Sequence, residues 1–448
     1  MIDIIYIAYE FPPLNRGGTQ RALKFVKYLR DFGINPHVLA LDPKSYPAVY
    51  DRYHCDETTV GEIPQEIEVT HIPSQNIIRF YTGKLRSFFN IYFSTVDREA
   101  YGWRPYFQPA VDELVKRAKP KAILTTVPPF SIAPLGLEVA KKYALPFILD
   151  MRDEWTYWIT APYGSYFHYL ARLKKERQCL SQADAIVCTS EQAMRDFQRI
   201  HPGIPPSRYH LVMNGYDEEI ADWSMPSMKA ANGRFKIGYV GNFYYEPRSR
   251  EGLMQPWWRK KGHRMIQYVP RKEDWLYRSP YFFFRALRCL FDAHEEMARK
   301  AEVHFAGFKP RWIDEMVEKF DLERQVKFLG RISLRDSLEF QESCDALLIT
   351  SSKVLNGEDY SIASKTFEYI SRRKPILGFV TAGAQKRLLE KTGVSVLCDP
   401  DDPCASAEHM KNLIEGTYPL HPNGAFLESL HRKHMTRKLA DVIKSVVK

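Results

Sequence analysis

Lys365 and Glu368 stand three positions apart at the start of a predicted helix and can both contact a nucleotide. Residues at this spacing share one face of a helix. A carboxylate can accept two hydrogen bonds from the hydroxyls of a ribose, and a lysine at a helix start can meet a diphosphate. The alternative is an ordinary helix start with a surface ion pair, which contributes little to stability. Both residues therefore become candidates for a nucleotide site.

Gly17 and Gly18 form a second candidate, because they precede another predicted helix. Without Cβ atoms, their backbone N–H groups can approach a phosphate at the positive end of that helix. The alternative is a tight loop with no ligand, and short glycine pairs are common turn signals. The chain contains no Gly-x-Gly-x-x-Gly sequence, so the fingerprint of a nicotinamide dinucleotide site is absent.

Arg152 and Asp153 follow the end of a predicted strand, where the side chains of a parallel sheet meet ligands. Asp153 can orient an acceptor hydroxyl as a hydrogen-bond acceptor or weak base. Equally, Asp150 or Asp153 can cap the next helix. The sequence alone leaves both interpretations open.

Arg278 precedes a predicted helix that contains Phe284, Leu287 and Leu290. An arginine keeps its charge when it is partly buried and can bind a phosphate through two parallel hydrogen bonds. The alternative is a solvated residue at a helix start.

Short apolar runs alternate with amphipathic helical stretches along the whole chain. In the first half, runs of this kind occupy residues 4–8, 36–41, 122–124, 147–150, 185–188 and 209–213. In the second half they occupy residues 236–240, 303–306, 326–329, 346–349, 375–379 and 394–397. This pattern predicts an α/β fold of two doubly wound, Rossmann-like domains with parallel sheets.

A polar stretch between the two halves sets the predicted domain boundary. We expect an N-terminal domain over residues 1–225 and a C-terminal domain over residues 226–420. A C-terminal segment, residues 421–448, carries a helix that we expect to dock on the N-terminal domain. Residues 244–277 lack the periodicity and read as an insertion in the C-terminal domain, rich in tryptophan, arginine and lysine. We expect this insertion to contact the substrate that accepts a transferred group and not a nucleotide; the alternative is a flap that packs its tryptophans on its own domain.

Composition narrows the class of protein. The chain has 448 residues, 45% of them hydrophobic, with a net charge of +10, which favours anionic partners. No apolar run is long enough to cross a bilayer, and the first residues do not resemble a secretory signal. The seven scattered cysteines form no Cys-x-x-Cys pair, so we expect neither disulfides nor a bound metal. We also expect the protein to be cytoplasmic, because free cysteines fit a reducing compartment.

Several ordered motifs resemble those of family 4 retaining glycosyltransferases. In the N-terminal half they are Phe11-Pro12-Pro13 with Gly17-Gly18, residues 183–191 (ADAIVCTSE) and residues 214–217 (NGYD). In the C-terminal half they are residues 326–331 (VKFLGR), 344–346 (CDA), and 367–369 (FEY) before 374–376 (KPI). The resemblance covers nearly the whole chain. It implies a GT-B fold with two domains facing a cleft, a nucleotide-sugar donor in the C-terminal half, no metal, and retention of the anomeric configuration.

The resemblance also assigns roles to single residues, with departures. Glu368 takes the place of the family's nucleotide-side glutamate, but the expected sugar-side glutamate is replaced by Tyr360, and we assign the sugar contact to Asp359. The family's arginine after the first C-domain strand is missing, and Arg278 stands near its lysine. Where many members have a histidine, this chain has Arg152 or Asp153.

The sequence therefore predicts transfer of a sugar from a UDP- or GDP-linked donor to a glycan or lipid-linked acceptor, as in polysaccharide biosynthesis. One alternative is a sugar-nucleotide epimerase of the same fold. Another is a basic nucleic-acid-binding protein using residues 257–272, although we expect no nucleic-acid partner. The basic and aromatic stretch over residues 79–93 is either a core helix or a peripheral contact with the inner, anionic face of a membrane.

Overall fold

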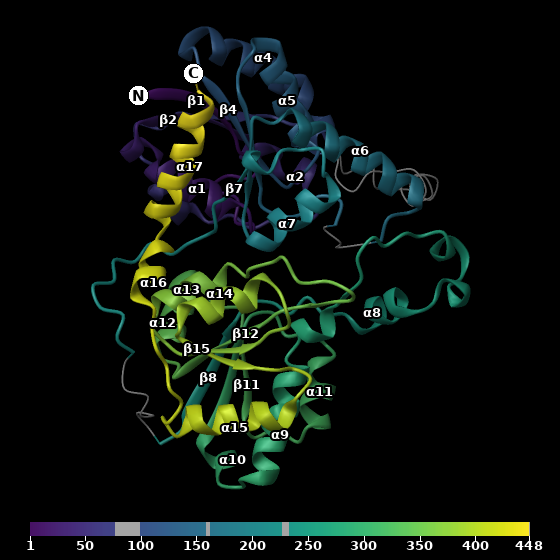
Figure 1. Cartoon of the computed structure of the whole chain (residues 1–448), viewed down its shortest axis with the longest axis vertical. Helices are drawn as coiled ribbons and strands as arrows, with labels where there is room; N and C mark the ends of the chain where they lie inside the picture. The colour runs from purple at the N-terminus through teal and green to yellow at the C-terminus, as the bar shows by residue number, and fades with distance from the viewer. Residues whose placement is uncertain (77–98, 158–161, 226–232, 448) are drawn as a thin grey trace. The chain divides into compact units, whose positions relative to one another are not determined.

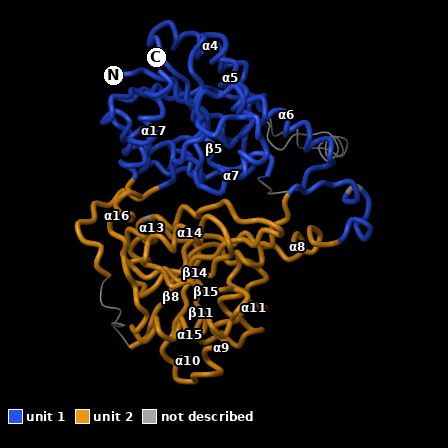
Figure 2. The backbone as a smooth tube through the Cα atoms, viewed as in Figure 1, with its two compact units in different colours: residues 1–214, 256–270, 432–448 blue, residues 215–255, 271–431 orange. Residues whose placement is uncertain are grey.

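The computed structural model of the protein describes residues 1–76, 99–157, 162–225 and 233–447. The chain divides into two compact units (Figure 2). Unit 1 contains residues 1–214, 256–270 and 432–448, and unit 2 contains residues 215–255 and 271–431. The basic and aromatic stretch over residues 79–93 lies outside the described residues.

Unit 1 is built on a seven-stranded parallel sheet in the order β3-β2-β1-β4-β5-β6-β7. Its strands are β1 (Ile2–Ile7), β2 (Ile34–Leu41), β3 (Val69–Ile72), β4 (Ala122–Val127), β5 (Phe147–Met151), β6 (Ala185–Cys188) and β7 (Tyr209–Leu211). In the central strand, Ile4 lies opposite Pro36 on one side and Ala122 on the other. Every residue of β4, β5 and β6 is buried, as expected for parallel strands covered on both faces.

Helices α1 and α17 pack against each other in unit 1, although they stand at opposite ends of the chain (Figure 1). The longer helices of this unit are α1 (Thr19–Leu29), α4 (Glu99–Ala118), α5 (Ile132–Tyr143), α6 (Tyr166–Gln182), α7 (Glu191–Ile200) and α17 (Arg432–Val446). Helix α17 buries Met435, Leu439 and Ile443, which recur at the helical period. The expected docking of the C-terminal helix on the N-terminal unit is confirmed.

Unit 2 contains a six-stranded parallel sheet in the order β11-β10-β8-β12-β14-β15. Its strands are β8 (Phe235–Val240), β10 (Ala301–Ala306), β11 (Val326–Gly330), β12 (Ala346–Thr350), β14 (Ile376–Phe379) and β15 (Ser395–Cys398). A separate antiparallel pair joins β9 (Glu273–Asp274) to β13 (Lys353–Val354). The two parallel sheets confirm the predicted architecture of two Rossmann-like domains.

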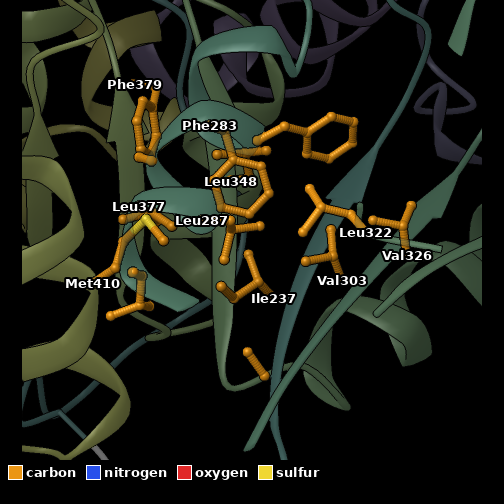
Figure 3. Packing of buried hydrophobic residues seen from close by; sticks show 14 of the residues in the cluster. Ile237, Phe283, Leu287, Val303, Leu322, Val326, Leu348, Leu377, Phe379 and Met410 are labelled. Carbon is orange, nitrogen blue, oxygen red and sulfur yellow. The ribbon is translucent and has the colours of Figure 1, made fainter. Parts of the chain in front are cut away.

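One hydrophobic cluster fixes the helices of unit 2 on their sheet (Figure 3). Ile237, Leu348 and Leu377 come from three neighbouring strands, and Phe283 and Met410 reach them from helices α9 and α15. All five side chains are at most 1% exposed. The helices of this unit are α8 (Pro247–Met254), α9 (Tyr281–Ala293), α10 (Met297–Lys300), α11 (Ile313–Lys319), α12 (Leu334–Glu342), α13 (Lys365–Ser371), α14 (Ala384–Thr392), α15 (Pro403–Ile414) and α16 (Gly424–Ser429).

The division between the units falls at Asn214 and Gly215, whereas the sequence placed a boundary at residue 225. Tyr216 explains the difference, because its hydroxyl donates a 2.9 Å hydrogen bond to the Leu427 carbonyl and its ring packs edge-on against Trp223. These contacts hold the residues after Gly215 within unit 2.

The stretch over residues 244–277 is not one insertion in the structure. Residues 244–255 and 271–277 belong to unit 2, and residues 256–270 belong to unit 1. The segment after residue 420 is divided in the same way, with α16 in unit 2 and α17 in unit 1.

Candidate functional site

Two glycines end neighbouring strands at the carboxyl edge of the unit 2 sheet. Gly241 (φ +118°) follows β8, and Gly307 (φ +151°) follows β10. A Cβ atom on Gly307 would lie 2.2 Å from the Gly241 carbonyl oxygen, so this crossing of two backbones requires glycine. A Cβ atom on Gly241 would lie 2.7 Å from the Lys365 ammonium, so the missing side chain leaves the room that this ammonium uses. Ligands of doubly wound sheets bind at this edge.

Lys365, the first residue of α13, reaches the end of β8. Its ammonium donates a 2.6 Å hydrogen bond to the Val240 carbonyl oxygen and lies 3.8 Å from the centre of the Tyr239 ring. Both partners are neutral. Burial of the ammonium lowers its pKa to about 8, and the positive charge of Arg278 acts in the same direction. Within the part of the chain that the structure describes, no carboxylate forms an ion pair with Lys365, which lies at the edge where a ligand is expected.

Tyr369 ties α13 to the same strand end. Its hydroxyl oxygen accepts a 2.9 Å hydrogen bond from the Val240 amide. The backbone of Val240 thus contacts Lys365 through its carbonyl and Tyr369 through its amide, and the start of α13 is fixed against β8. Glu368, one turn after Lys365 and half-buried, is close enough that its charge raises the pKa of Lys365. The structure brings Lys365 and Glu368 together as predicted from their spacing.

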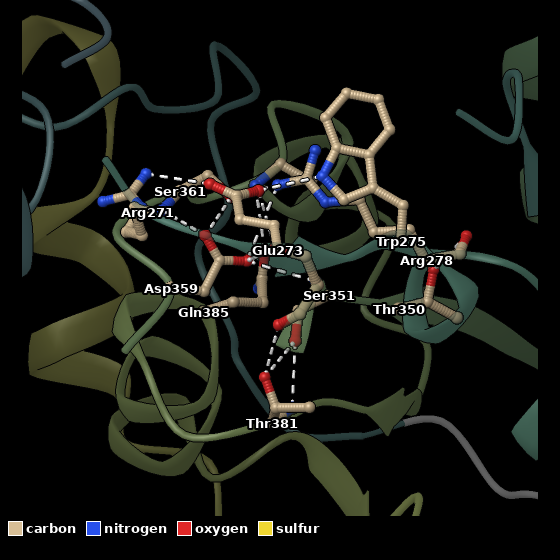
Figure 4. Close-up of polar contacts among 12 residues, drawn as sticks. Arg271, Glu273, Trp275, Arg278, Thr350, Ser351, Asp359, Ser361, Thr381 and Gln385 are labelled. Atoms are coloured by element: carbon tan, nitrogen blue, oxygen red, sulfur yellow. Dashed lines mark hydrogen bonds and ion pairs between the residues drawn. The ribbon is translucent and has the colours of Figure 1, made fainter. Parts of the chain in front are cut away.

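Arg278 lies beside the end of β12. Thr350, the last residue of that strand, donates a 3.1 Å hydrogen bond from its hydroxyl to the Arg278 carbonyl oxygen. Its guanidinium donates a 2.5 Å hydrogen bond to the Ser361 hydroxyl and lies 3.6 Å from the Asp359 carboxylate (Figure 4). The side chain is 24% exposed. Arg278 is therefore held in place by specific partners and is not simply a solvated residue at a helix start.

Asp359 is 1% exposed, and its carboxylate is already surrounded by donors. One oxygen accepts from the amide and hydroxyl of Ser361 (2.9 and 2.7 Å), and the other accepts from the amide and hydroxyl of Ser352 (3.2 and 3.0 Å). The sequence predicts that Asp359 contacts the sugar. In the structure its carboxylate is buried and orients Ser361 and Arg278.

A second carboxylate, that of Glu273, contacts the same group of residues. Glu273 accepts hydrogen bonds from Arg271 and from the Trp275 indole, both 2.9 Å, and from the Ser352 hydroxyl at 3.3 Å (Figure 4). The single hydroxyl proton of Ser352 is therefore shared between Glu273 and Asp359, with the shorter distance to Asp359. Because Trp275 is hydrogen-bonded inside unit 2, it supports the loop that carries Arg278.

In unit 1, the predicted glycine pair lies at the start of α1. Gly18 is the N-cap residue, without a side-chain cap, and Thr19 is the first helical residue. The Arg152 guanidinium occupies the space beside Gly18, where an added Cβ atom would fall 1.1 Å from Nη1. The structure thus brings Arg152 to the glycine pair, and Gly18 leaves the room that this side chain uses.

The Arg152 side chain is 8% exposed and lies 3.3 Å from the Glu10 carboxylate. Its Nη2 also donates to the Pro128 carbonyl oxygen. Two further nitrogens, Nε and Nη1, have no hydrogen-bond partner among the described residues. A buried guanidinium with free donors, beside the N-terminus of α1, can receive an anion.

Neither Asp150 nor Asp153 caps the next helix that the structure describes. That helix, α6, begins at Tyr166 and is capped by Ser165, whose hydroxyl accepts from the His168 amide. Asp150 instead forms a buried, two-point ion pair with Arg21, at 2.8 to 3.2 Å. Asp153 is half-buried in the turn after β5.

The sequence interpretation missed Gly241, Gly307, Tyr239 and Ser361. A signal was present for the glycines, since each directly follows the last residue of an apolar run. Within the described ranges, no three His, Cys, Asp or Glu side chains gather as they would around a metal ion. Likewise, none of the helices described has the length and apolar character needed to cross a bilayer.

Two family models match the chain. A glycosyl transferase 4-like domain matches residues 16–215, and a glycosyl transferases group 1 model matches residues 279–416. One curated relative, a probable glycosyltransferase WbjE of Pseudomonas aeruginosa, is 27% identical over 124 residues. That match covers 27% of this chain and only 30% of the relative.

Solved structures share the fold along the whole chain. Anabaena HepE in complex with UDP has a TM-score of 0.59 at 14% identity, and covers 99% of this chain and 100% of its own. The lipopolysaccharide outer core galactosyltransferase WaaB has a TM-score of 0.57 at 13% identity, with 99% of both chains covered. A putative UDP-N-acetylglucosamine 2-epimerase from Listeria monocytogenes is somewhat less similar, with a TM-score of 0.52 at 10% identity over 99% and 96% of the two chains.

The two matched models, in order on two Rossmann-like units, define a GT-B fold. Both matched models describe glycosyltransferases and together span most of the chain, so the chain belongs with these enzymes.

Proposed function

We propose that the protein transfers a sugar from a UDP- or GDP-linked donor to a glycan or lipid-linked acceptor, with retention of the anomeric configuration. The observation that carries this proposal is the unit 2 cluster, in which Lys365 reaches the end of β8 at Gly241 and Arg278 is close enough for its charge to lower the pKa of Lys365. Two neighbouring cations at this edge of the sheet form a suitable site for a diphosphate. HepE, which shares the fold, is described in complex with UDP.

In this proposal each residue has a defined role toward the donor. Glu368 accepts hydrogen bonds from the ribose hydroxyls, and Lys365 and Arg278 bind the diphosphate. Asp359 and Ser361 keep the Arg278 guanidinium oriented, so Asp359 is a positioning residue. No metal is required, because the two side-chain cations supply the positive charge that a divalent ion would otherwise provide.

During transfer, the bond between the anomeric carbon and the β-phosphate oxygen breaks, and a bond to the acceptor oxygen forms. The negative charge that develops on the departing diphosphate is stabilised by Lys365 and Arg278. The bonding electron pair stays on the departing phosphate oxygen, and in this proposal that oxygen takes the proton that the acceptor hydroxyl loses. We assign Asp153 to the orientation of that hydroxyl and Arg152, with the Gly17–Gly18 amides, to a phosphate group of donor or acceptor.

The second candidate is a sugar-nucleotide epimerase, since an epimerase shares the fold. An epimerase converts its sugar nucleotide without any acceptor. Sugar-nucleotide conversion in the absence of acceptor would therefore favour the epimerase over the glycosyltransferase.

Thermal unfolding with candidate ligands tests the proposal. UDP or GDP should raise the melting temperature and NAD should not; a ligand at one hundred times its Kd adds about 2.7 kcal/mol to the free energy of unfolding. Lys365→Met, which removes the charge from the diphosphate site, should abolish most of the nucleotide shift. Stabilisation by NAD but by neither nucleoside diphosphate would refute the proposal.

A further inference from the structure

Residues 256–270 join unit 1 through a two-point backbone bridge. The Tyr163 amide donates to the Tyr268 carbonyl at 2.9 Å, and the Tyr268 amide donates to the Tyr163 carbonyl at 3.0 Å. The Tyr268 ring also packs against Tyr166 and Tyr169 of α6, with ring centres 4.9 and 4.8 Å apart. Figure 2 shows this segment in the colour of unit 1, although its flanking residues on both sides belong to unit 2. The segment is therefore anchored next to the first turn of α6.

Apolar side chains are exposed on both partners of this junction. Trp257 and Trp258 are 64% and 66% exposed, and Phe167 on α6 is 80% exposed. The other large apolar residues exposed on the two elements are Tyr166, Leu170, Met265 and Ile266. We call these seven residues the apolar surface of unit 1. The alternative of a flap that packs its tryptophans on its own domain is thus not observed for Trp257 and Trp258.

The same two elements carry more exposed basic residues than acidic ones. Arg259, Lys261 and Arg264 are exposed between the apolar residues, and no acidic residue occurs between Glu251 and Glu273. On α6, Lys174, Lys175 and Arg177 are exposed, and the single carboxylate of that helix, Glu176, is buried. This excess of positive charge favours an anionic partner.

Aliphatic side chains distinguish among anionic partners. Tryptophan and arginine suit nucleic acid as well as lipid, because bases stack on aromatic rings. Leu170, Met265 and Ile266 neither stack on bases nor bind phosphate, yet they are exposed on the same two elements. Exposed aliphatic and aromatic residues mixed with lysine and arginine fit the boundary between headgroups and acyl chains of an anionic bilayer.

We propose that the apolar surface of unit 1, with Arg259, Lys261 and Arg264, binds the surface of an anionic membrane. The tryptophans and aliphatic side chains enter the headgroup region, and the basic side chains contact lipid phosphates. This binding is independent of the nucleotide chemistry in unit 2, and it places the enzyme where a lipid-linked acceptor would be available.

Cosedimentation of the full chain with lipid vesicles tests this proposal. We expect binding to vesicles of equal parts phosphatidylcholine and phosphatidylglycerol, and much weaker binding to phosphatidylcholine alone. Replacing Arg259, Lys261 and Arg264 together by glutamine should weaken binding roughly a hundredfold, since each basic residue near an anionic surface contributes about fivefold. Replacing Trp257 and Trp258 by alanine should weaken it at least about tenfold.

The matched control replaces Tyr101 and Tyr106 by alanine. Both are exposed aromatic residues of unit 1, on α4 and away from the described junction in sequence, and vesicle binding should be unchanged. All variants should keep the wild-type melting temperature and its shift with UDP or GDP. The proposal is overturned if wild type does not bind anionic vesicles at low salt, if the tryptophan variant binds as wild type does, or if RNA is bound in preference to vesicles. Loss of the nucleotide shift alone would refute the proposed transfer reaction and leave membrane binding intact.

Discussion

Arg278 and Asp359 form an ion pair of 3.6 Å that is completed by a third side chain. Ser361 accepts a hydrogen bond from the Arg278 guanidinium and donates one to Asp359 at 2.7 Å. The buried carboxylate of Asp359 therefore orients the Arg278 guanidinium in two ways: directly through the ion pair, and indirectly through the Ser361 hydroxyl. Preorganisation of this kind lets a cation meet developing charge without first rearranging.

Asp359→Asn should weaken both the fold of unit 2 and donor binding. The amide cannot accept from all four surrounding donors, and it leaves Arg278 without its counter-charge. We expect the free energy of unfolding to fall by about 2 kcal/mol, as for lost hydrogen bonds to a charged group. Donor affinity should fall with it, as measured by calorimetry with UDP or GDP.

Asp314→Asn is the matched control. Asp314 is an exposed carboxylate of the same unit, paired with Lys309 at 2.7 Å, and surface pairs contribute little. Its urea unfolding and nucleotide affinity should match wild type. Equal behaviour of the two variants would contradict the positioning role of Asp359.

The charge of Lys365 predicts a pH dependence of nucleotide binding. Its pKa of about 8 means that the free protein loses this positive charge between pH 7 and pH 9. A diphosphate binds the charged form, so affinity for UDP or GDP should fall about tenfold over this range. Stability should move in the opposite direction. The folded pKa lies below the ordinary value of 10.5, so the unfolded chain binds more protons from pH 8 to 10.5 and stability from this group rises there.

Lys365→Met removes the titrating group and should give weak nucleotide affinity that is flat from pH 7 to pH 9. Calorimetry at three pH values distinguishes the two proteins. A wild-type affinity that stays constant over this range, with Lys365→Met binding as tightly, would exclude the lysine from the diphosphate site.

Glu368→Ala should reduce donor affinity without unfolding the chain. The residue is half-buried on α13 and is not among the buried residues of that helix. We expect roughly a tenfold or greater loss of affinity for UDP or GDP, since two hydrogen bonds to a charged acceptor are removed, and an unchanged melting temperature without ligand. Glu390→Ala, an exposed glutamate on α14, is the control. A Glu368→Ala variant with full activity at low donor concentration would remove this residue from the site.

The fold was accessible from the sequence because its signals are local. Apolar runs such as residues 185–188 and helical repeats such as residues 191–200 identify their elements within a few positions, and the structure places a strand and a helix there. Their alternation then limits the sheet to a parallel, doubly wound one. The boundary between the two units was harder to predict from the sequence, because Tyr216 is held in unit 2 by its hydrogen bond to Leu427, some two hundred positions away.

The site was accessible only in part, because its geometry depends on distant partners. Lys365 and Glu368 share a helix, and their spacing alone placed them together. The partner of Lys365, Val240, lies 125 positions away, and nothing in the sequence shows that this ammonium is buried against Tyr239. The same holds for Asp359, whose burial among serine hydroxyls gives it a supporting position that its residue type does not reveal.

Gly18→Ala should disturb Arg152, and Gly17→Ala should not, which makes the two adjacent glycines a matched pair. A Cβ atom on Gly18 would fall 1.1 Å from the Arg152 guanidinium, whereas a Cβ atom on Gly17 meets nothing within 4 Å. The backbone of Gly18 is in the right-handed helical region, so alanine is strained only by contact with Arg152. Because that contact is with a side chain, the guanidinium can move away, and we expect a modest loss of about 1–2 kcal/mol in the free energy of unfolding.

The displacement matters for function if Arg152 binds a phosphate beside the N-terminus of α1. Gly18→Ala should then lower the rate of sugar transfer at saturating donor by more than tenfold, the usual loss when a positioned charge moves. Nucleotide binding through Lys365 and Arg278 in unit 2 should persist, as measured by the thermal shift with UDP or GDP. Arg152→Lys should resemble Gly18→Ala, because lysine keeps the charge but not the forked donor geometry. If Gly17→Ala impairs transfer as strongly as Gly18→Ala does, the defect comes from the backbone of the loop, and Arg152 is not the group that Gly18 accommodates for catalysis.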